Sequence, residues 1–381
     1  MPRLSPRSHA PRALKPTPAP SRCALASKRL VPPEPRQAVR RMRPYSPPTA
    51  GRLGKLRLDF NENTIGTSAQ VLHCLRQALD PSLLPVYPEY GSLRQALARH
   101  FKVAPANLLL TNGTDEAIQV FINTYIDDGA QVITLSPSYA MYRFYAELAG
   151  ARVQEVRYRA PDLAFPLEEL LERITEATRG VMIANPNNPT GTGTSRPGLE
   201  KILTRAGRAA VLVDEAYFEF CGVTALPLLE TYPNLFVCRT FSKVYGLAAM
   251  RAGCLFSRRE NVEFLRKAQS PYSVNTLAAT AAAAAVKDTS FVRRYVAESL
   301  AARELLYAGF ERLGITYYKS QANFVLFRAG RRAAEICHKL RGRGILVRDR
   351  SYELPGCVRV TTGTRAQARR FLQELERIWK A

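Results

Sequence analysis

A lysine just beyond a short apolar run is the residue with the clearest chemical use in this sequence. Lys243 stands in the segment 240–251 (Thr-Phe-Ser-Lys-Val-Tyr-Gly-Leu-Ala-Ala-Met-Arg), and the apolar run 235–238 before it predicts a buried strand. An amine among hydroxyls, followed by an arginine, suits an aldehyde cofactor that carries a phosphate. The amine can form a Schiff base, while the hydroxyls and the guanidinium bind the phosphate. A solvated loop lysine is the alternative that this segment alone leaves open.

Two apolar runs upstream also end in polar side chains of matching chemistry. The run 210–213 leads to Asp214, and a buried Asp at a strand end can keep a pyridine nitrogen protonated. The run 181–184 leads into a turn rich in Asn, Pro and Gly, where the amide of Asn188 can donate to a phenolate oxygen. Each unit could be an ordinary capped loop. Three of them in this order indicate a site for pyridoxal 5'-phosphate.

At this point the sequence resembles a known family. The resemblance is to the fold-type I, pyridoxal-phosphate-dependent aminotransferases of class I/II, and among them to the histidinol-phosphate aminotransferases. It runs from about residue 43 to the C-terminus and implies transamination of L-histidinol phosphate with 2-oxoglutarate, a step of histidine biosynthesis. It also implies a homodimer with shared active sites. The segments that carry it are 58–63, 87–90, 112–116, 187–191, 214–217, 240–251 and 358–361.

The resemblance implies a role for each catalytic residue. Lys243 would form the Schiff base and move the proton between the substrate Cα and the cofactor C4′. Asp214 would pair with the pyridine nitrogen. Tyr217 and Asn188 would donate to the phenolate oxygen. Tyr139 would stack on the cofactor ring, with plain core packing as its alternative.

The cofactor phosphate is expected at the start of a helix. The turn 112–115 opens a helix expected over 116–125, whose first backbone N–H groups can receive an anion. An ordinary capped helix start is the alternative. Tyr87 resembles the tyrosine that reaches the phosphate of the partner subunit's cofactor. The resemblance assigns the phosphate to Gly113, Thr114, Asp115, Thr240, Ser242 and Arg251.

The substrate is expected to meet two arginines. Arg359 fits the family arginine that grips the substrate carboxylate as a bidentate fork. Arg348 lies where the histidinol-phosphate enzymes hold the substrate phosphate. Asn63 and Asn323 are expected in the same site, although Thr64 stands where proline often follows Asn63 in the family. Solvated arginines that could compete for the role of Arg348 are Arg341, Arg343 and Arg350.

Three other functions remain open from the sequence. Two share the fold and cofactor: an aminotransferase for aromatic or other amino acids, and a phosphothreonine-type decarboxylase. The third is a basic, non-catalytic protein that binds nucleic acid, but no winged-helix module fits in the short proline-rich tail. The favoured hypothesis is an enzyme that acts on small-molecule substrates and binds no specific nucleic acid.

Composition limits the class of protein. The 381 residues are 46% hydrophobic, enough for a large core. Apolar runs fall short of the roughly 20 residues that span a bilayer, so no membrane partner is expected. Seven cysteines without regular spacing and four scattered histidines predict neither disulfides nor a metal site. Reduced thiols indicate a cytoplasmic protein.

The formal charge of +23 is concentrated at the N-terminus. Residues 1–50 contribute a net charge of +10 and hold 12 of the 26 prolines. Such a segment cannot bury enough apolar surface to order itself, so residues 1–42 are expected to be a disordered tail. The tail could be a nucleic-acid or membrane arm, a transit peptide, or translated non-coding sequence. The third alternative, with the start at Met42, or a tail without function is favoured.

Strand and helix patterns alternate to about residue 260, which predicts an α/β fold with a mostly parallel central sheet and helices on both faces. Ligands in such folds bind at the carboxyl ends of strands. Residues 86–272 are assigned to this large, cofactor-binding domain. Residues 273–381 are assigned to a smaller α+β domain, against which an N-terminal arm, 43–85, folds.

Overall fold

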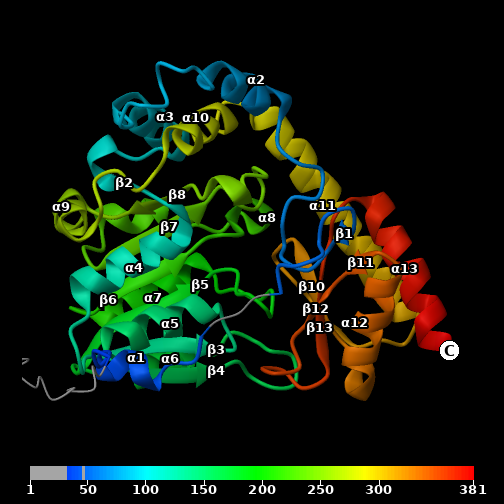
Figure 1. Cartoon of the computed structure of the whole chain (residues 1–381). Helices are drawn as coiled ribbons and strands as arrows, with labels where there is room; N and C mark the ends of the chain where they lie inside the picture. The colour runs from blue at the N-terminus through cyan, green and yellow to red at the C-terminus, as the bar shows by residue number, and fades with distance from the viewer. Residues whose placement is uncertain (1–31, 45–47) are drawn as a thin grey trace, which may run out of the picture.

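The structure, a computed structural model, describes residues 32–44 and 48–381. A seven-stranded sheet forms the centre of the large domain (Figure 1). Its strands are β2 (Leu108–Thr111), β3 (Gln131–Ser136), β4 (Arg152–Arg157), β5 (Thr178–Ala184), β6 (Ala210–Asp214), β7 (Leu235–Thr240) and β8 (Gly253–Phe256). In space they follow the order β2-β8-β7-β6-β5-β3-β4. All neighbours run parallel except at β8, which is antiparallel to β2 and β7.

Helices cover both faces of this sheet. Successive residues of a strand point to opposite faces, so Ile183 packs into one core cluster and its neighbour Met182 into another. The helices on the first face are α2 (Ala69–Ala78), α3 (Gly91–Phe101), α6 (Leu167–Arg173), α7 (Arg196–Ala206) and α10 (Thr276–Ala285). Those on the second are α4 (Gly113–Tyr125), α5 (Ala140–Ala149) and α9 (Arg259–Ala268). The predicted α/β architecture is confirmed.

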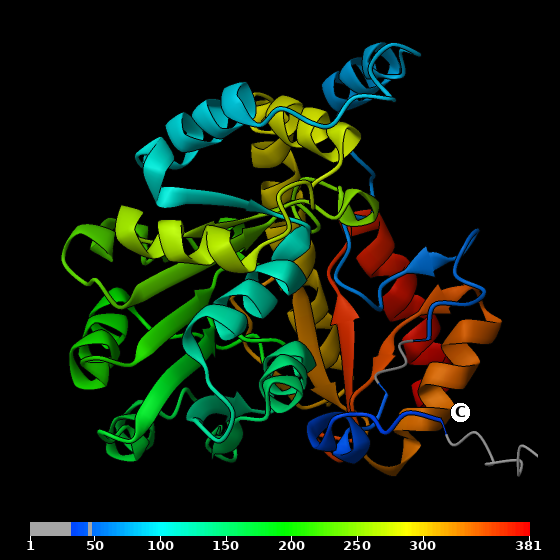
Figure 2. The same ribbon diagram turned by 60° about the vertical axis from the view of Figure 1, so that its left-hand side comes forward.

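The smaller domain is built on antiparallel strands. A four-stranded sheet has the order β12 (Arg348–Asp349), β13 (Cys357–Thr361), β10 (Phe324–Arg328), β9 (Tyr317–Tyr318). Beside it, β1 (Leu56–Arg57) pairs in parallel with β11 (Ile345–Leu346). Its helices are α11 (Thr289–Arg312), α12 (Ala333–Gly342) and α13 (Arg365–Lys380). Figure 2 shows this domain beside the large one, with β1 next to α13.

The domain boundaries differ from those expected. The sequence predicts α10 in the small domain and α2 in an arm against it, but the two helices pack on each other and share the large-domain core. The alanine-rich sequence of α10 allows this close approach. The helix α11 joins both domains, because Tyr295 packs in the large-domain core and Phe310 in the small-domain core. The arm contacts the small domain near β1, where Leu58 enters its core, and at Thr64, which donates to Gln367 of α13.

The basic tail is helical in part. Helix α1 (Gln37–Arg41) contacts α5, so the prediction of disorder is wrong for these residues. Packing against an ordered helix supplies contacts that the composition of the tail did not suggest. The expected disorder of residues 1–31, together with their alternative origins, lies outside the described residues. The remaining short helices are α8 (Phe218–Cys221), η1 (Pro105–Asn107), η2 (Leu226–Glu230), η3 (Ala248–Met250) and η4 (Gly330–Arg332).

Two further properties were searched over residues 32–44 and 48–381. No helix there is both long and apolar enough to cross a bilayer. The same residues contain no cluster of three or more His, Cys, Asp or Glu side chains arranged for a metal ion.

Candidate active site

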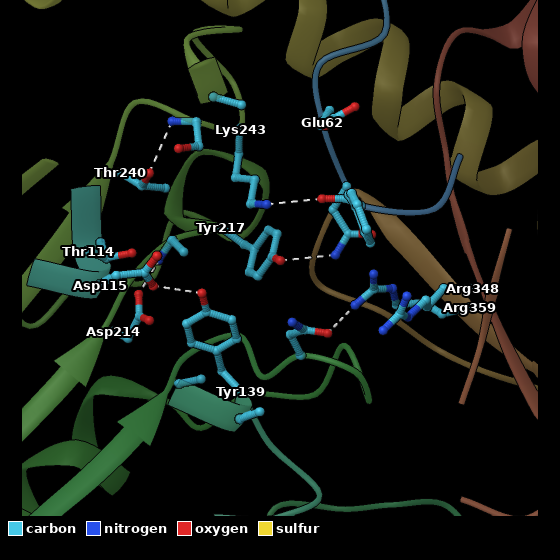
Figure 3. A pocket seen from close by; sticks show the side chains of 18 of the residues that line it. Glu62, Thr114, Asp115, Tyr139, Asp214, Tyr217, Thr240, Lys243, Arg348 and Arg359 are labelled. Carbon is cyan, nitrogen blue, oxygen red and sulfur yellow. Dashed lines mark hydrogen bonds between the residues drawn. The ribbon is translucent and has the colours of Figure 1, made fainter. Parts of the chain in front are cut away.

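A cavity of ≈ 520 Å³ lies where the two domains meet. On the large-domain side it opens at the carboxyl ends of β5, β6 and β7, as expected for ligands of parallel sheets. Figure 3 shows Lys243 and Tyr217 pointing into it from one side and Arg348 and Arg359 facing them from the other. The structure therefore brings together residues that are more than 100 positions apart in the sequence.

Lys243 lies at the centre of this arrangement. Its Nζ donates a 3.0 Å hydrogen bond to the carbonyl oxygen of Phe60, in the N-terminal arm. The same nitrogen lies 5.9 Å from the ring centroid of Tyr217. An amine that ends in a cavity and is held by one neutral acceptor is well placed to react with a carbonyl compound.

Asp214 is a buried carboxyl in the wall of the cavity. Tyr142 donates to its Oδ2 over 2.7 Å, and the backbone N–H of Ala216 donates to its Oδ1 over 3.0 Å. Burial raises the pKa of Asp214 to about 6, although hydrogen bonds from Tyr142, Ala216 and Cys238 oppose the shift. A cation beside this carboxyl would favour its ionised form. A protonated pyridine nitrogen would fit this requirement.

Two side chains of the cavity are oriented by partners from the N-terminal arm and the small domain. The hydroxyl oxygen of Tyr217 accepts a 2.9 Å hydrogen bond from Nδ2 of Asn61. The Oδ1 of Asn188 accepts a hydrogen bond from Nη1 of Arg359. These bonds leave the Tyr217 hydroxyl proton and the Asn188 amide N–H groups available as donors. Both could therefore donate to a phenolate oxygen, as the sequence predicts.

The start of α4 forms a cradle for an anion. Gly113 has a φ of +75°, and a Cβ there would meet the guanidinium of Arg251 at 2.6 Å. Asp115 lies in the same turn and pairs with Arg251 over 2.9 Å, while its other oxygen accepts from the hydroxyl of Tyr139 over 2.7 Å. A carboxylate repels a phosphate, so the side chain of Asp115 is better suited to orienting Arg251 and Tyr139. The backbone N–H groups of the turn remain the donors for the anion.

Hydroxyl side chains complete this end of the cavity. Thr114, Thr240 and Ser242 all line it. The Oγ1 of Thr240 accepts a 3.0 Å hydrogen bond from the backbone N–H of Ser242, which fixes the turn that leads to Lys243. Together with Arg251 and the start of α4, these groups fit a phosphate monoester. The cavity therefore fits pyridoxal 5'-phosphate at two points. These groups suit its phosphate, and the carboxylate of Asp214 suits its protonated ring nitrogen.

Two arginines face this set from the small domain. Arg348 on β12 and Arg359 on β13 lie directly opposite each other in the antiparallel pair. Arg359 is buried and donates from Nη2 to the carbonyl oxygen of Asp59 over 2.6 Å. Burial lowers its pKa to about 10, with a further contribution from Arg350, so Arg359 is still charged at neutral pH. Two like charges across one strand pair favour the binding of an anion between them.

A family model supports this assignment. The model for aminotransferase class I and II matches residues 54–375. The chain belongs to this family. A histidinol-phosphate aminotransferase of Symbiobacterium thermophilum is 39% identical over 355 residues, which cover 90% of this chain and 97% of the relative.

Solved structures agree on the class I and II fold. The histidinol-phosphate aminotransferase of Sinorhizobium meliloti, solved in complex with pyridoxal-5'-phosphate, has a TM-score of 0.81 at 26% identity, covering 93% of this chain and 99% of that one. A mutant of Thermus thermophilus aspartate aminotransferase has a TM-score of 0.77 at 23% identity, with 91% of this chain and 99% of the other covered. The second likeness shows the shared fold alone.

Four residues expected in this aminotransferase site do not line its cavity: Gly113, Asn63, Asn323 and Tyr87. Asn63 is buried and donates to the carbonyl oxygen of Val244 over 2.9 Å, so it ties the arm to the lysine loop. Asn323 is also buried and donates to the carbonyl oxygen of Asn61 over 3.1 Å. Both side chains therefore hold backbone segments near the cavity in place, and neither is positioned in its wall to contact a substrate. Tyr87 is 71% exposed.

Several cavity residues escaped the sequence analysis. Tyr142 lies in the amphipathic helix α5, where its spacing is that of an ordinary core residue. Arg350, interpreted as a solvated alternative to Arg348, is only 6% exposed and lines the cavity. The alternation Arg-Asp-Arg from 348 to 350 could have revealed it, since residues two apart in an extended chain share a face. Glu62 also lines the cavity, where Arg52 and Arg57 both pair with it.

Proposed function

We propose that this aminotransferase transfers the amino group of L-histidinol phosphate to 2-oxoglutarate, with pyridoxal 5'-phosphate as cofactor, in histidine biosynthesis. The observation that carries the proposal is the opposed pair Arg348 and Arg359, which faces Lys243 across the cavity. The pair suits a doubly charged phosphate in one half-reaction and a carboxylate in the other. The name of the Symbiobacterium thermophilum relative supports the same substrate.

Each of the cavity residues would have its own role in the reaction. When bound, pyridoxal phosphate supplies an electron sink for the pair released from the substrate Cα–H bond. Asp214 would keep the ring nitrogen protonated, and Asn188 and Tyr217 would donate to the phenolate oxygen. Lys243 would carry the proton between Cα and C4′. Arg359, fixed by Asp59 and Asn188, would orient the substrate so that its Cα–H bond stands perpendicular to the ring.

A donor panel tests the substrate. The purified protein with bound cofactor is mixed with 2-oxoglutarate and one donor at a time: L-histidinol phosphate, phenylalanine, aspartate or phosphothreonine. Glutamate formation reports transamination, and carbon dioxide release reports decarboxylation. The highest kcat/KM is expected for L-histidinol phosphate. A higher value for phenylalanine or aspartate, or carbon dioxide from phosphothreonine, would assign the protein to one of the alternatives.

We also propose a homodimer with shared active sites. The segment around Tyr87 exposes several apolar side chains, and the Tyr87 ring stacks on that of Tyr272 at a centroid distance of 4.3 Å. An exposed apolar patch of this kind suits a subunit interface. Its exposed members are Leu79, Leu83, Leu84, Val86, Tyr87 and Tyr272. Light scattering of the purified protein would report a mass of one chain or two.

Mixed dimers test the sharing. A Tyr87→Ala chain combined with a Lys243→Ala chain should form some dimers in which one site is intact, provided that Tyr87 serves the partner's site. Activity above that of either parent variant is then expected. If Tyr87 serves its own site instead, each site of the mixed dimer carries one of the two changes, and the mixture should be no more active than the parent variants. The protein is proposed to work in the cytoplasm, where the six described cysteines would stay free thiols, as they are in the structure.

A further inference from the structure

A third arginine lies beside the pair that faces Lys243. Arg350 follows β12 directly and, two residues after Arg348, lies on the same face of the strand. Its backbone N–H donates to the carbonyl oxygen of Cys357 over 2.9 Å, which continues the pairing with the start of β13. All three guanidinium-bearing side chains, from Arg348, Arg350 and Arg359, line the same cavity.

The side chain of Arg350 is buried but only partly satisfied. Its exposed fraction is 6%, and its Nε has no hydrogen-bond partner among the described residues. Its Nη2 pairs with Glu353 three residues later, within the hairpin that connects β12 and β13. The guanidinium also lies 5.1 Å from the centroid of the Tyr352 ring. A buried donor left without an acceptor is costly, so the site favours an incoming anion.

The charges around Arg350 also favour an incoming anion. Three arginines meet there, and Glu353 is the carboxylate that pairs with one of them. The carboxylate of Glu62, which lines the cavity near the arm, is already paired with Arg52 and Arg57. Burial raises the pKa of Glu353 although the charges of all three cavity arginines oppose this shift. The part of the cavity lined by the three arginines therefore has a net positive charge, which a monocarboxylate balances less well than a phosphate dianion.

We propose that Arg350 is a specificity residue that binds the phosphate of the amino donor together with Arg348, and that Glu353 is its counter-ion when no phosphate is bound. This inference rests on the proposed function for the identity of the donor. It assigns different tasks to the arginines: Arg359 binds whichever anion the substrate presents, and Arg350 adds a contact that only a phosphate needs. Glu353 competes with the phosphate for the same guanidinium.

Arg350→Gln tests the contact in the enzyme with bound cofactor. Three quantities are measured: kcat/KM for L-histidinol phosphate, kcat/KM for glutamate as a phosphate-free donor, and the inhibition constant of inorganic phosphate with glutamate as donor. Because Arg350 would make a charge-assisted hydrogen bond in a buried site, the ratio of kcat/KM for L-histidinol phosphate to kcat/KM for glutamate should fall by about tenfold or more. Inhibition by inorganic phosphate should weaken by about the same factor. Arg343→Gln is the matched control, because Arg343 lies in the same domain in an exposed pair with Glu374.

A structural role for Arg350 gives a different result. If the residue only closes the hairpin, Arg350→Gln lowers the melting temperature and reduces kcat/KM equally for both donors, and the proposal is overturned. Glu353→Gln separates the cases again, since it keeps the fold of the hairpin and releases Arg350. Tighter inhibition by inorganic phosphate is expected for this variant, and unchanged or weaker inhibition contradicts the counter-ion role.

Failure of the donor assignment is distinguishable from failure of the inference. If the wild-type enzyme does not turn over L-histidinol phosphate, the proposed function falls. Inorganic phosphate then decides the role of Arg350 alone. Weakened inhibition in Arg350→Gln supports a phosphate contact, and an unchanged inhibition constant overturns it.

Discussion

The hydroxyl of Tyr142 donates a 2.7 Å hydrogen bond to Oδ2 of Asp214, and both side chains are buried. The bond joins helix α5 to the end of the central strand β6. It supplies one of the few interactions that favour the ionised form of a carboxyl whose burial favours the neutral form. Tyr142 is therefore placed to control how well Asp214 can hold a positive charge, without contact to the substrate.

Tyr142→Phe should weaken the site without disturbing its packing. Loss of a hydrogen bond to a charged acceptor costs roughly 1.5–3 kcal/mol, so kcat should fall by about tenfold or more. Affinity of the cofactor-free protein for pyridoxal phosphate should fall as well, measured by absorbance titration. Tyr125→Phe is the control, because its hydroxyl binds Asn261 between α4 and α9. Wild-type kcat and cofactor affinity in Tyr142→Phe would contradict this role.

Lys243→Ala should abolish transamination. The amine is the group placed to carry the proton, and removal of such a general base lowers rates by about 10²–10⁴-fold. The visible absorbance of the bound cofactor should change as well, because the covalent bond to the protein is lost. Single-turnover measurements with glutamate would show whether any half-reaction survives. Lys201→Ala, an exposed change on α7, should leave both quantities unaffected.

The pKa of Asp214 predicts a pH dependence of stability in the cofactor-free protein. The pKa is 3.8 in the reference state and about 6 in the folded protein, so the folded state binds more protons between these values. The free energy of unfolding should therefore be highest below about pH 4 and fall as pH rises to 6, by about 3 kcal/mol at most from this group. Asp214→Asn should lack this component.

Denaturant titrations at several pH values measure the difference between the wild type and Asp214→Asn. A difference that stays constant from pH 4 to 7 would show that the carboxyl is ionised throughout. The same variant should retain pyridoxal phosphate but lose most of its rate, since a neutral amide cannot stabilise a protonated ring nitrogen. Near-wild-type activity would contradict that role.

Sequence patterns predicted where two residues of the large-domain half of the site lie, although they did not reveal Tyr142. Asp214 and Lys243 each follow a continuous apolar run, and such runs predict buried parallel strands whose carboxyl ends meet at one edge. Neighbouring strands β6 and β7 do place the two residues on the same cavity. This part of the geometry depends on local periodicity and on a general property of parallel sheets, both of which a single sequence contains.

The small-domain half was harder to predict, because its geometry depends on packing between distant segments. Arg350 is buried in the hairpin between β12 and β13, whereas Arg343 stays exposed, and only the spacing of Arg350 from Arg348 distinguishes the two in the sequence. Asn63 and Asn323 lie near the cavity, but their amides donate to the backbone carbonyl oxygens of Val244 and Asn61. Which acceptor an amide finds is decided by tertiary contacts more than 180 residues away in the chain.

The pair Arg348 and Arg359 should respond differently to substitution. Arg348→Ala should lower kcat/KM for L-histidinol phosphate by about 10- to 100-fold more than for glutamate, because only the phosphate donor makes the charged contact. Arg359→Ala should impair both donors and 2-oxoglutarate, since Arg359 also fixes Asn188. Steady-state kinetics with both donors measure this contrast. Equal losses with both donors in Arg348→Ala would favour a general aminotransferase.

The last prediction concerns the buried ion pair behind the site. Arg239 on β7 and Glu215 just after β6 pair over 2.8 Å with almost no exposure, and Thr224 and Ala225 also donate to the carboxylate. The guanidinium lies 3.6 Å from the ring centroid of Phe218. The pair thus connects the segment that carries Asp214 to the segment that carries Lys243.

Arg239→Met should lower the free energy of unfolding by about 3–5 kcal/mol, because Glu215 is left as a buried charge without its opposite. Denaturant titration measures this loss. Adding Glu215→Leu should recover part of it, since the double variant no longer buries an unpaired charge. The control is Arg312→Met, which breaks an exposed pair with Glu376 and should cost about 1 kcal/mol or less. If Arg239→Met costs no more than Arg312→Met, the buried pair does not hold the two strand ends together.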